Sequence, residues 1–186
     1  MGRRFTVAEA AHALEQGGVL AYPTEAVFGL GCDPLNEAAV RRLLAIKQRS
    51  WEKGLILVAS CYGQLLRYVD DGALSEAQRQ RVLARWPGPV TWVMPAKESV
   101  PDWLTGQFDS IAVRVSDHTI VKSLCSAFGG PLVSTSANLS GEEPARTMAQ
   151  VERDLGQLVD GVVLGEVGGN PSPSTILDAR SGQVLR

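Results

Sequence analysis

The 186 residues fit a single domain, and a chain of this size buries roughly 70% of its unfolded surface around one core. The formal net charge of −2 argues against wholesale electrostatic binding of nucleic acid. The three cysteines are widely spaced and form no C-x-x-C pair, and no apolar run could serve as a signal-peptide core or a bilayer span. We therefore expect residues 1–186 to form one cytoplasmic domain with no disulfide framework and no membrane partner.

Capping residues and apolar periodicity predict a helix, a strand and a second helix at the start of the chain. A capping box at 6–9 begins the first helix, which two glycines end. The apolar run 18–21 is short and is bounded by glycine and proline. It predicts a buried strand that ends in a loop over 22–34. Asn36 then caps a helix with an apolar stripe that ends near Ile46.

Helices and strands continue to alternate through the rest of the chain. Further helices are expected over 62–68, 75–84, 117–128 (capped by Asp117) and 147–158, and further strands over 55–58, 90–94, 111–115, 132–133 and 161–164. The segment 96–110 lacks periodicity and is expected to be an ordered loop. Ser181-Gly182 predicts a turn between two terminal antiparallel strands, 175–178 and 183–185. This order predicts an α/β domain with a mixed sheet.

Thr24 and Glu25 stand where the first predicted strand ends. The end of a buried strand is a usual place for a ligand, and the following glycines and Pro34 would let the backbone turn closely around Thr24. The same two residues could instead cap a following helical turn. The stretch alone fits both interpretations.

Two cations and two serine-rich loops form a second group of candidates. Lys47 and Arg49 leave the end of the second predicted helix, where they either face an anion or only complement the helix dipole. The loop 134–141 offers the hydroxyl, amide and backbone donors of an anion or nucleotide cradle, although serine-rich turns are common. Taken together with the two cations and the serine-rich segment 172–175, this loop favours a ligand site.

Arg114 lies within an otherwise apolar predicted strand. Alternation places Ile111, Val113 and Val115 on one face and Ala112 with Arg114 on the other, so the second face must be polar or hold an anion. An arginine fork binds a carboxylate through two hydrogen bonds, so Arg114 is the candidate for the carboxylate of an amino-acid substrate. An exposed arginine on an open sheet face is the alternative.

Other site chemistries find little support in the sequence. His12 and His118 have no cysteine or carboxylate at ligand spacing, so no metal site is expected. Neither a Walker A motif nor G-x-G-x-x-G is present, and there is no nucleophile elbow. The lack of a nucleophile indicates a site that positions substrates and neutralises charge, so that the substrates themselves carry out the attack.

Five segments, taken in order, carry a resemblance to a known family: 22–25, 47–49, 86–91, 112–115 and 134–141. Together they are similar to the YrdC-like family over nearly the whole chain. The resemblance implies a twisted, open, mixed β-sheet flanked by helices, of the YrdC/RibB-like type. The family usually has proline after the Lys-x-Arg arginine, whereas this chain has Ser50, which is expected to loosen that loop. The sequence stops at Arg186, so the additional C-terminal domain of longer relatives is not expected.

The family resemblance also implies an activity. It indicates a nucleotidyltransferase that makes L-threonylcarbamoyladenylate and pyrophosphate from L-threonine, bicarbonate or carbon dioxide, and ATP. This is the first step towards N6-threonylcarbamoyladenosine in tRNA. A carbamate oxygen would attack the α-phosphorus, and Lys47 and Arg49 would be catalytic by offsetting phosphate charge. Mg²⁺ would arrive with ATP, and no tightly bound organic cofactor is expected. A downstream threonylcarbamoyl-transferase complex is an implied partner, and tRNA is a further candidate.

Matching motif positions implies a role for each site residue. Those implied for ATP are Lys47, Arg49, Ser110, Ser136, Asn138, Pro144 and Arg186. Those implied for threonine are Thr24, Arg114, Ser134 and Ser174. A buried polar contact to the threonine hydroxyl would explain selection against an amino acid that lacks that group.

Two other classes of function use the same residues. An RNA-binding module, acting on tRNA or in ribosomal RNA maturation, would use a basic concave face formed by Lys47, Arg49, Lys53 and Arg114. Its RNA affinity should fall steeply with salt and should not depend on threonine. A nucleotide sensor would bind ATP without turnover, and pyrophosphate release that requires threonine would count against it.

Overall fold

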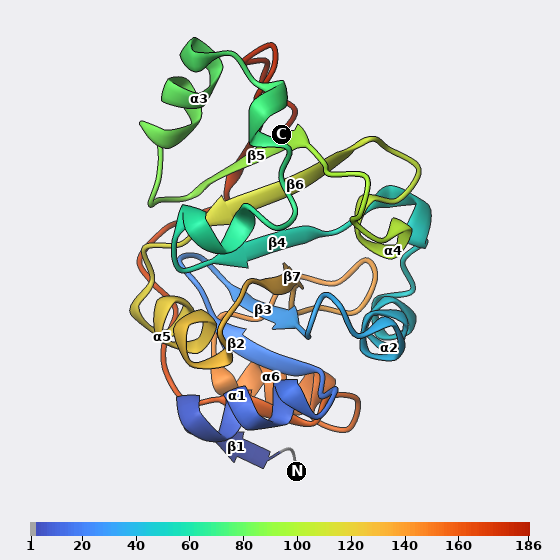
Figure 1. Ribbon diagram of the computed structural model, residues 1–186. Coiled ribbons are helices and arrows are strands. Elements are labelled where there is room, and N and C mark those ends of the chain that lie inside the picture. The colour runs from blue at the N-terminus through green and yellow to red at the C-terminus, as the bar shows by residue number, and fades with distance from the viewer. Residues whose placement is uncertain (1–2) are drawn as a thin grey trace.

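The computed structural model describes residues 3–186, which form a nine-stranded mixed β-sheet with helices on both faces (Figure 1). The strands lie in the order β1 (Arg3–Phe5), β8 (Gly161–Val163), β2 (Leu20–Pro23), β3 (Phe28–Gly31), β7 (Leu132–Ser136), β4 (Ile56–Ala59), β6 (Ser110–Val115), β5 (Val90–Pro95) and β9 (Thr175–Asp178). The sheet contains both parallel pairs, such as β4 with β6, and antiparallel pairs, such as β3 with β7. The predicted mixed sheet is therefore confirmed.

The helices cover the sheet in two groups, each with its own apolar cluster. They are α1 (Val7–Glu15), α2 (Glu37–Lys47), α3 (Glu76–Leu83), α4 (Asp102–Thr105), α5 (Thr119–Phe128) and α6 (Met148–Leu155). Helices α1 and α5 pack against each other on one face, which receives Leu20 and Tyr22 of β2. Helices α2 and α6 pack on the other face, which receives Ala21. Because β2 supplies both clusters alternately, the sheet is the middle layer of the fold.

Side-chain caps explain where several helices begin. Thr6 and Glu9 form the predicted capping box at the start of α1, and the Asn36 side chain accepts a hydrogen bond from the Ala39 amide at 3.1 Å. The predicted cap of α5 is wrong by one residue. His118, not Asp117, is the N-cap, and its Nδ1 accepts from the Ile120 amide at 3.3 Å.

The expected loop over 22–34 is wrong, because β2 continues to Pro23 and Phe28–Gly31 pairs with it as β3. Glycine lowers strand propensity, which hid this strand in the sequence. In the sheet, a Cβ on Gly31 would lie 2.3 Å from the Val133 carbonyl oxygen and 2.6 Å from the Tyr22 ring. A bare backbone is therefore what lets β7 and the Tyr22 ring approach β3.

Other differences concern short elements. The strand expected over 132–133 runs on to Ser136, and the helix expected over 62–68 is only a 3₁₀ turn, Tyr62–Leu65. The segment expected as a loop over 96–110 includes the single-turn helix α4. The terminal hairpin forms, but its second arm contributes only the bridge between Leu177 and Val184. Between residues 3 and 186, no helix combines the length and apolar character that a membrane crossing needs.

Candidate active site

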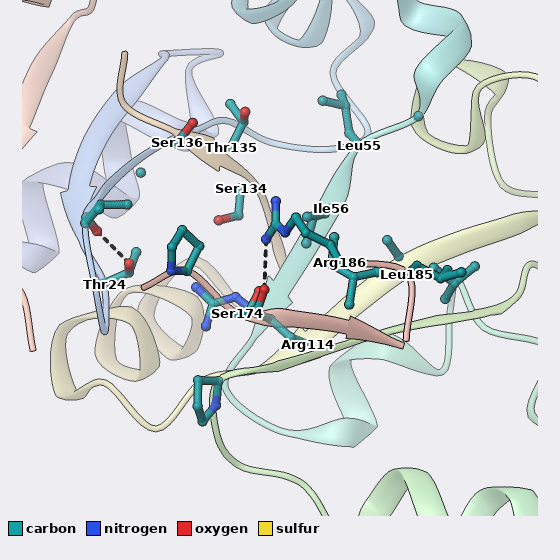
Figure 2. Close-up of a pocket in the computed structure, with 18 of the residues that line it drawn as sticks. Thr24, Leu55, Ile56, Arg114, Ser134, Thr135, Ser136, Ser174, Leu185 and Arg186 are labelled. Atoms are coloured by element: carbon teal, nitrogen blue, oxygen red, sulfur yellow. Dashed lines mark hydrogen bonds between the residues drawn. The ribbon is translucent and has the colours of Figure 1, made fainter. Parts of the chain in front are cut away.

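A cavity of about 710 Å³ gathers nearly all of the predicted site residues (Figure 2). The predicted residues that line it are Thr24, Arg49, Ser110, Arg114, Ser134, Ser136, Pro144, Ser174 and Arg186. Lys47 and Asn138 do not line it but bind to Ser136, which does. The residues assigned to two ligands from separate motifs therefore share one site.

The sheet order explains why these distant segments meet. Strand β7 lies between β3 and β4, and its register places Ser136 opposite Gly29 and Ser134 opposite Ile56. On the opposite edge of β4, Ile56 pairs with Ala112 of β6, and Val58 pairs with Arg114. The serines of β7 and the arginine of β6 consequently flank the same strand.

Arg114 and Glu25 form a largely buried ion pair at this site. Nη1 of Arg114 donates to Glu25 Oε1 at 2.9 Å and to Oε2 at 2.8 Å, and Ser116 Oγ donates to Oε2 at 3.1 Å. Arg114 is 7% exposed, so the alternative of an exposed arginine is wrong. Burial by itself would raise the pKa of the Glu25 carboxyl, but the Arg114 guanidinium and the Ser116 hydroxyl bring it below its ordinary value. Glu25 therefore remains ionised at neutral pH.

Lys47 connects the end of α2 to the turn that follows β7. Its Nζ donates to the carbonyl oxygens of Ser136 and Asn138 at 2.7 and 3.0 Å and to Asn138 Oδ1 at 2.5 Å. Burial lowers the pKa of the ammonium group to about 8, with a further contribution from the Arg49 charge. Lys47 thus shapes the Ser136–Asn138 turn and is poised to lose its proton just above neutral pH.

Arg49 lies on the cavity wall close to the loop that contains Gly54. Its Nη2 donates to the Gly54 carbonyl at 2.9 Å, whereas Nε is buried and has no hydrogen-bond partner among residues 3–186. Burial also lowers the pKa of this guanidinium group. A buried donor without a partner is unfavourable unless a ligand supplies an acceptor.

Hydrogen bonds hold the segment 168–174 in place beside the cavity. The Gly168 and Asn170 amides donate to the Thr24 and Glu25 carbonyls at 2.9 and 3.2 Å. Arg186 Nη2 donates to the Ser174 carbonyl at 2.9 Å, a bond drawn in Figure 2. These contacts hold residues 168–170 against the β2–β3 turn and the Arg186 side chain against Ser174.

Sequence reasoning missed two residues that build the site. The sequence marks Glu25 as a strand-end residue but indicates no role for it, because its partner Arg114 is 89 positions away in the sequence. Arg146 connects the β2–β3 turn to the loop that contains Pro171. Its guanidinium group donates to the Ala26 carbonyl at 3.1 Å and to the Pro171 carbonyl at 3.3 Å. No local pattern distinguishes Arg146 from a surface arginine, whereas the acidic residue next to Thr24 was a usable signal.

The charges on the wall indicate what the cavity can bind. The basic lining residues are Arg49, Lys53, Arg114 and Arg186, and the acidic one is Glu25. Ser110, Ser134 and Ser136 line the same cavity and supply hydroxyl groups. Guanidinium groups beside hydroxyls suit phosphate and carboxylate groups, so the cavity is equipped for anions.

Comparison with known proteins gives the family. The Sua5_yciO_yrdC family, described as "Telomere recombination", matches residues 12–186. The chain belongs to the Sua5/YciO/YrdC family. The predicted YrdC-like resemblance is therefore confirmed, and it covers nearly the whole chain.

Members of the Sua5/YciO/YrdC family resemble this chain in both sequence and structure. A protein of Yersinia enterocolitica named threonylcarbamoyl-AMP synthase is 57% identical over 98% of this chain and 96% of its own length. A variant of P. abyssi Sua5 has a TM-score of 0.92 at 29% identity and covers the whole chain. P. abyssi Sua5 complexed with L-threonine has a TM-score of 0.85 at 30% identity over 96% of the chain. The chain spans 60% and 53% of those two Sua5 chains.

Proposed function

We propose that the protein is a nucleotidyltransferase that makes L-threonylcarbamoyladenylate and pyrophosphate from L-threonine, bicarbonate or carbon dioxide, and ATP. This reaction would be the first step of threonylcarbamoyladenosine formation in tRNA. The observation that carries this proposal is the convergence of the predicted ATP and threonine residues on one cavity. It is supported by 57% identity to a relative named threonylcarbamoyl-AMP synthase, and by a Sua5 structure that contains L-threonine.

The two substrates would occupy neighbouring parts of the cavity. The residues proposed for threonine are Thr24, Arg114, Ser134 and Ser174, and those proposed for ATP are Arg49, Ser110, Ser136, Pro144 and Arg186. Lys47 and Asn138 would act on ATP through the Ser136–Asn138 turn that they hold. Because β7 contributes both Ser134 and Ser136, one strand would place the amino acid beside the phosphates.

The chemistry asked of the protein is positioning and charge stabilisation. Carbamate and α-phosphate must be held in line, and the charge that gathers on the phosphates must be offset by Arg49 and its neighbours. Mg²⁺ would enter with ATP, since it is commonly held by substrate phosphates and retains several waters. Among the described residues that line the cavity, the acidic one, Glu25, is paired with Arg114, so the cation would be held by the substrate phosphates and its waters, with the lining hydroxyls able to bind those waters.

The RNA-binding alternative loses much of its support. Of the four cations in the expected basic face, Arg114 is buried against Glu25 and Lys47 is held by the Ser136–Asn138 turn. A cytoplasmic location is part of the proposal, because the cysteines are free and two of them, Cys32 and Cys125, are buried in the core. The downstream threonylcarbamoyl-transferase complex and tRNA are the partners proposed for the product.

Pyrophosphate release is the direct test. The purified protein, with ATP, Mg²⁺ and bicarbonate, should release pyrophosphate with L-threonine and far less with L-serine, L-valine or no amino acid. Isolation of the threonylcarbamoyl adenylate would identify the product. If the folded protein releases no pyrophosphate in any mixture, the proposal fails, and salt-dependent binding of tRNA would then favour the RNA-binding alternative.

ATP affinity should fall as pH rises through about 8, where the Lys47 ammonium loses its proton. The sign follows from the lowered pKa: Lys47 is charged below this value and neutral above it, so it loses a donor and a positive charge near the phosphates. The last phosphate proton is lost with a pKa of about 6, so the charge of ATP barely changes over this range. Calorimetric titration from pH 7 to 9 measures the effect.

A charge-preserving variant is the control for this pH dependence. Lys47→Arg should keep its positive charge over the whole range and give a nearly flat ATP affinity. A wild-type affinity that does not change up to pH 9 would remove Lys47 from the group that acts on ATP.

A further inference from the structure

Glu25 is the one acidic side chain among the described residues that line the cavity. The other charged lining residues, Arg49, Lys53, Arg114 and Arg186, are all basic. A carboxylate opposes the binding of phosphate and carboxylate groups in its neighbourhood. Its presence in a cavity suited to anions therefore indicates a specific positive or hydrogen-donating partner.

Arg114 accounts for only part of the hydrogen-bonding capacity of Glu25. A carboxylate offers about four acceptor sites. Among the described residues, Oε1 accepts one hydrogen bond, from Arg114, and Oε2 accepts two, from Arg114 and Ser116. The Glu25 side chain is 13% exposed and lies on the cavity wall. The backbone amide of Glu25 also contacts the carboxylate, so a ligand donor would meet the part of the carboxylate that is exposed to the cavity.

Arg114 likewise retains donors. Its hydrogen bonds to residues 3–186 all use Nη1, so that Nε and Nη2 can still bind a carboxylate. The pair therefore presents the remaining donors of Arg114 beside the exposed part of the Glu25 carboxylate, because the two side chains are bonded to each other at 2.8 Å. An α-amino acid carries its carboxylate and its nitrogen on the same carbon, so its two polar groups could meet adjacent Arg114 and Glu25 side chains at once.

We propose that Glu25 binds the α-nitrogen of the amino-acid substrate while Arg114 binds its carboxylate, so that the pair selects an α-amino acid over a simple hydroxy acid. This inference rests on the proposed function, because it takes threonine as the substrate.

Hydroxyl groups in the proposed threonine half already have partners. Thr24 Oγ1 donates to the Val27 carbonyl at 2.6 Å, and Ser174 Oγ is 2.8 Å from Thr91 Oγ1. These hydroxyls keep lone pairs, but among the described residues that line the cavity Glu25 is the acceptor that carries a negative charge. Because the carboxylate stays ionised at neutral pH, it can accept a hydrogen bond from the α-nitrogen, and the N–H of the carbamate can still donate that bond.

The test compares two ligands that differ in one group. L-Threonine and (R)-3-hydroxybutanoate share the carboxylate, the hydroxyl and the methyl group, but the second lacks the α-nitrogen. Wild-type protein should bind threonine at least about 10²-fold more tightly by calorimetric titration. Glu25→Gln should bind threonine about 10- to 100-fold more weakly, because it loses a charge-assisted hydrogen bond. It should bind (R)-3-hydroxybutanoate and ATP as well as the wild type or better, since a negative charge has been removed.

Glu37→Gln is the matched control. It makes the same change at an exposed carboxylate on α2, paired with Arg41, and should leave all three affinities unchanged. Equal weakening of threonine and (R)-3-hydroxybutanoate in Glu25→Gln would overturn the proposal, because Glu25 would then act only by holding Arg114. Equal affinity of the wild type for the two ligands would overturn it without any variant. Failure of the wild type both to bind threonine and to release pyrophosphate would instead overturn the proposed function, and this inference with it.

Discussion

Replacement of Arg49 by alanine is expected to reduce threonine-dependent pyrophosphate release by about 10²–10³-fold while the fold remains intact. Arg49 lines the cavity, and its Nε is a buried donor that finds no partner among residues 3–186. A fixed positive charge in a site that excludes water stabilises developing phosphate charge far more than it would in water. The measurement is the initial rate at saturating threonine over a range of ATP concentrations, together with the melting temperature.

Two further variants make the Arg49 result specific. Arg67→Ala removes an exposed arginine that does not line the cavity and should retain wild-type rates. Arg49→Lys keeps the charge but loses the planar fork, so it should fall between the wild type and Arg49→Ala. If Arg49→Ala is folded and its rate stays within about threefold of the wild type, a catalytic role for Arg49 is wrong.

The alternation of residues in one strand predicted the chemistry around Arg114 but not its partner. Because Arg114 interrupts an apolar strand, the sequence required a polar or anionic group on its face, and Glu25 is that group. The pairing joins β6 to the β2–β3 turn, which are distant in sequence. Periodicity reports on faces within one element, so it cannot identify contacts made by tertiary folding.

Strand propensity did not predict β3 or the end of β7, where neighbouring backbones approach closely or polar residues face the cavity. Gly29 and Gly31 read as loop residues, yet they lie in β3, where Gly31 makes room for the Val133 carbonyl and the Tyr22 ring. Ser134 and Ser136 likewise read as a polar loop, although β7 includes both of them. At both places a functional or steric requirement overrides the usual strand composition, and three of these residues, Gly29, Ser134 and Ser136, line the cavity.

The role of Lys47 shows a third limit. Its place at the end of α2 was clear from the sequence, but the direction of its side chain was not. In the fold, Nζ turns to the Ser136–Asn138 backbone and the lysine does not line the cavity. Family motifs identify which residues belong to a site, whereas hydrogen-bond geometry separates a residue that faces the cavity from one that holds its wall.

Arg114→Ala is expected to weaken threonine binding by more than about 10²-fold and ATP binding by less than about threefold. It should also destabilise the fold by about 3 kcal/mol, because removal of one partner leaves the Glu25 carboxylate buried without a counter-charge. For a chain of this length, this loss corresponds to a fall in melting temperature of roughly 6–12 °C. Titration calorimetry with each ligand and thermal unfolding measure the two effects separately.

A double variant distinguishes the two roles of Arg114. Arg114→Ala combined with Glu25→Gln removes the orphaned charge together with the arginine, so it should melt at a higher temperature than Arg114→Ala alone. It should not recover threonine affinity, because the donors for the substrate carboxylate are still missing. Equal losses of ATP and threonine affinity in Arg114→Ala would contradict the assignment of Arg114 to threonine. A double variant no more stable than the single one would show that Glu25 is not an uncompensated charge when Arg114 is absent.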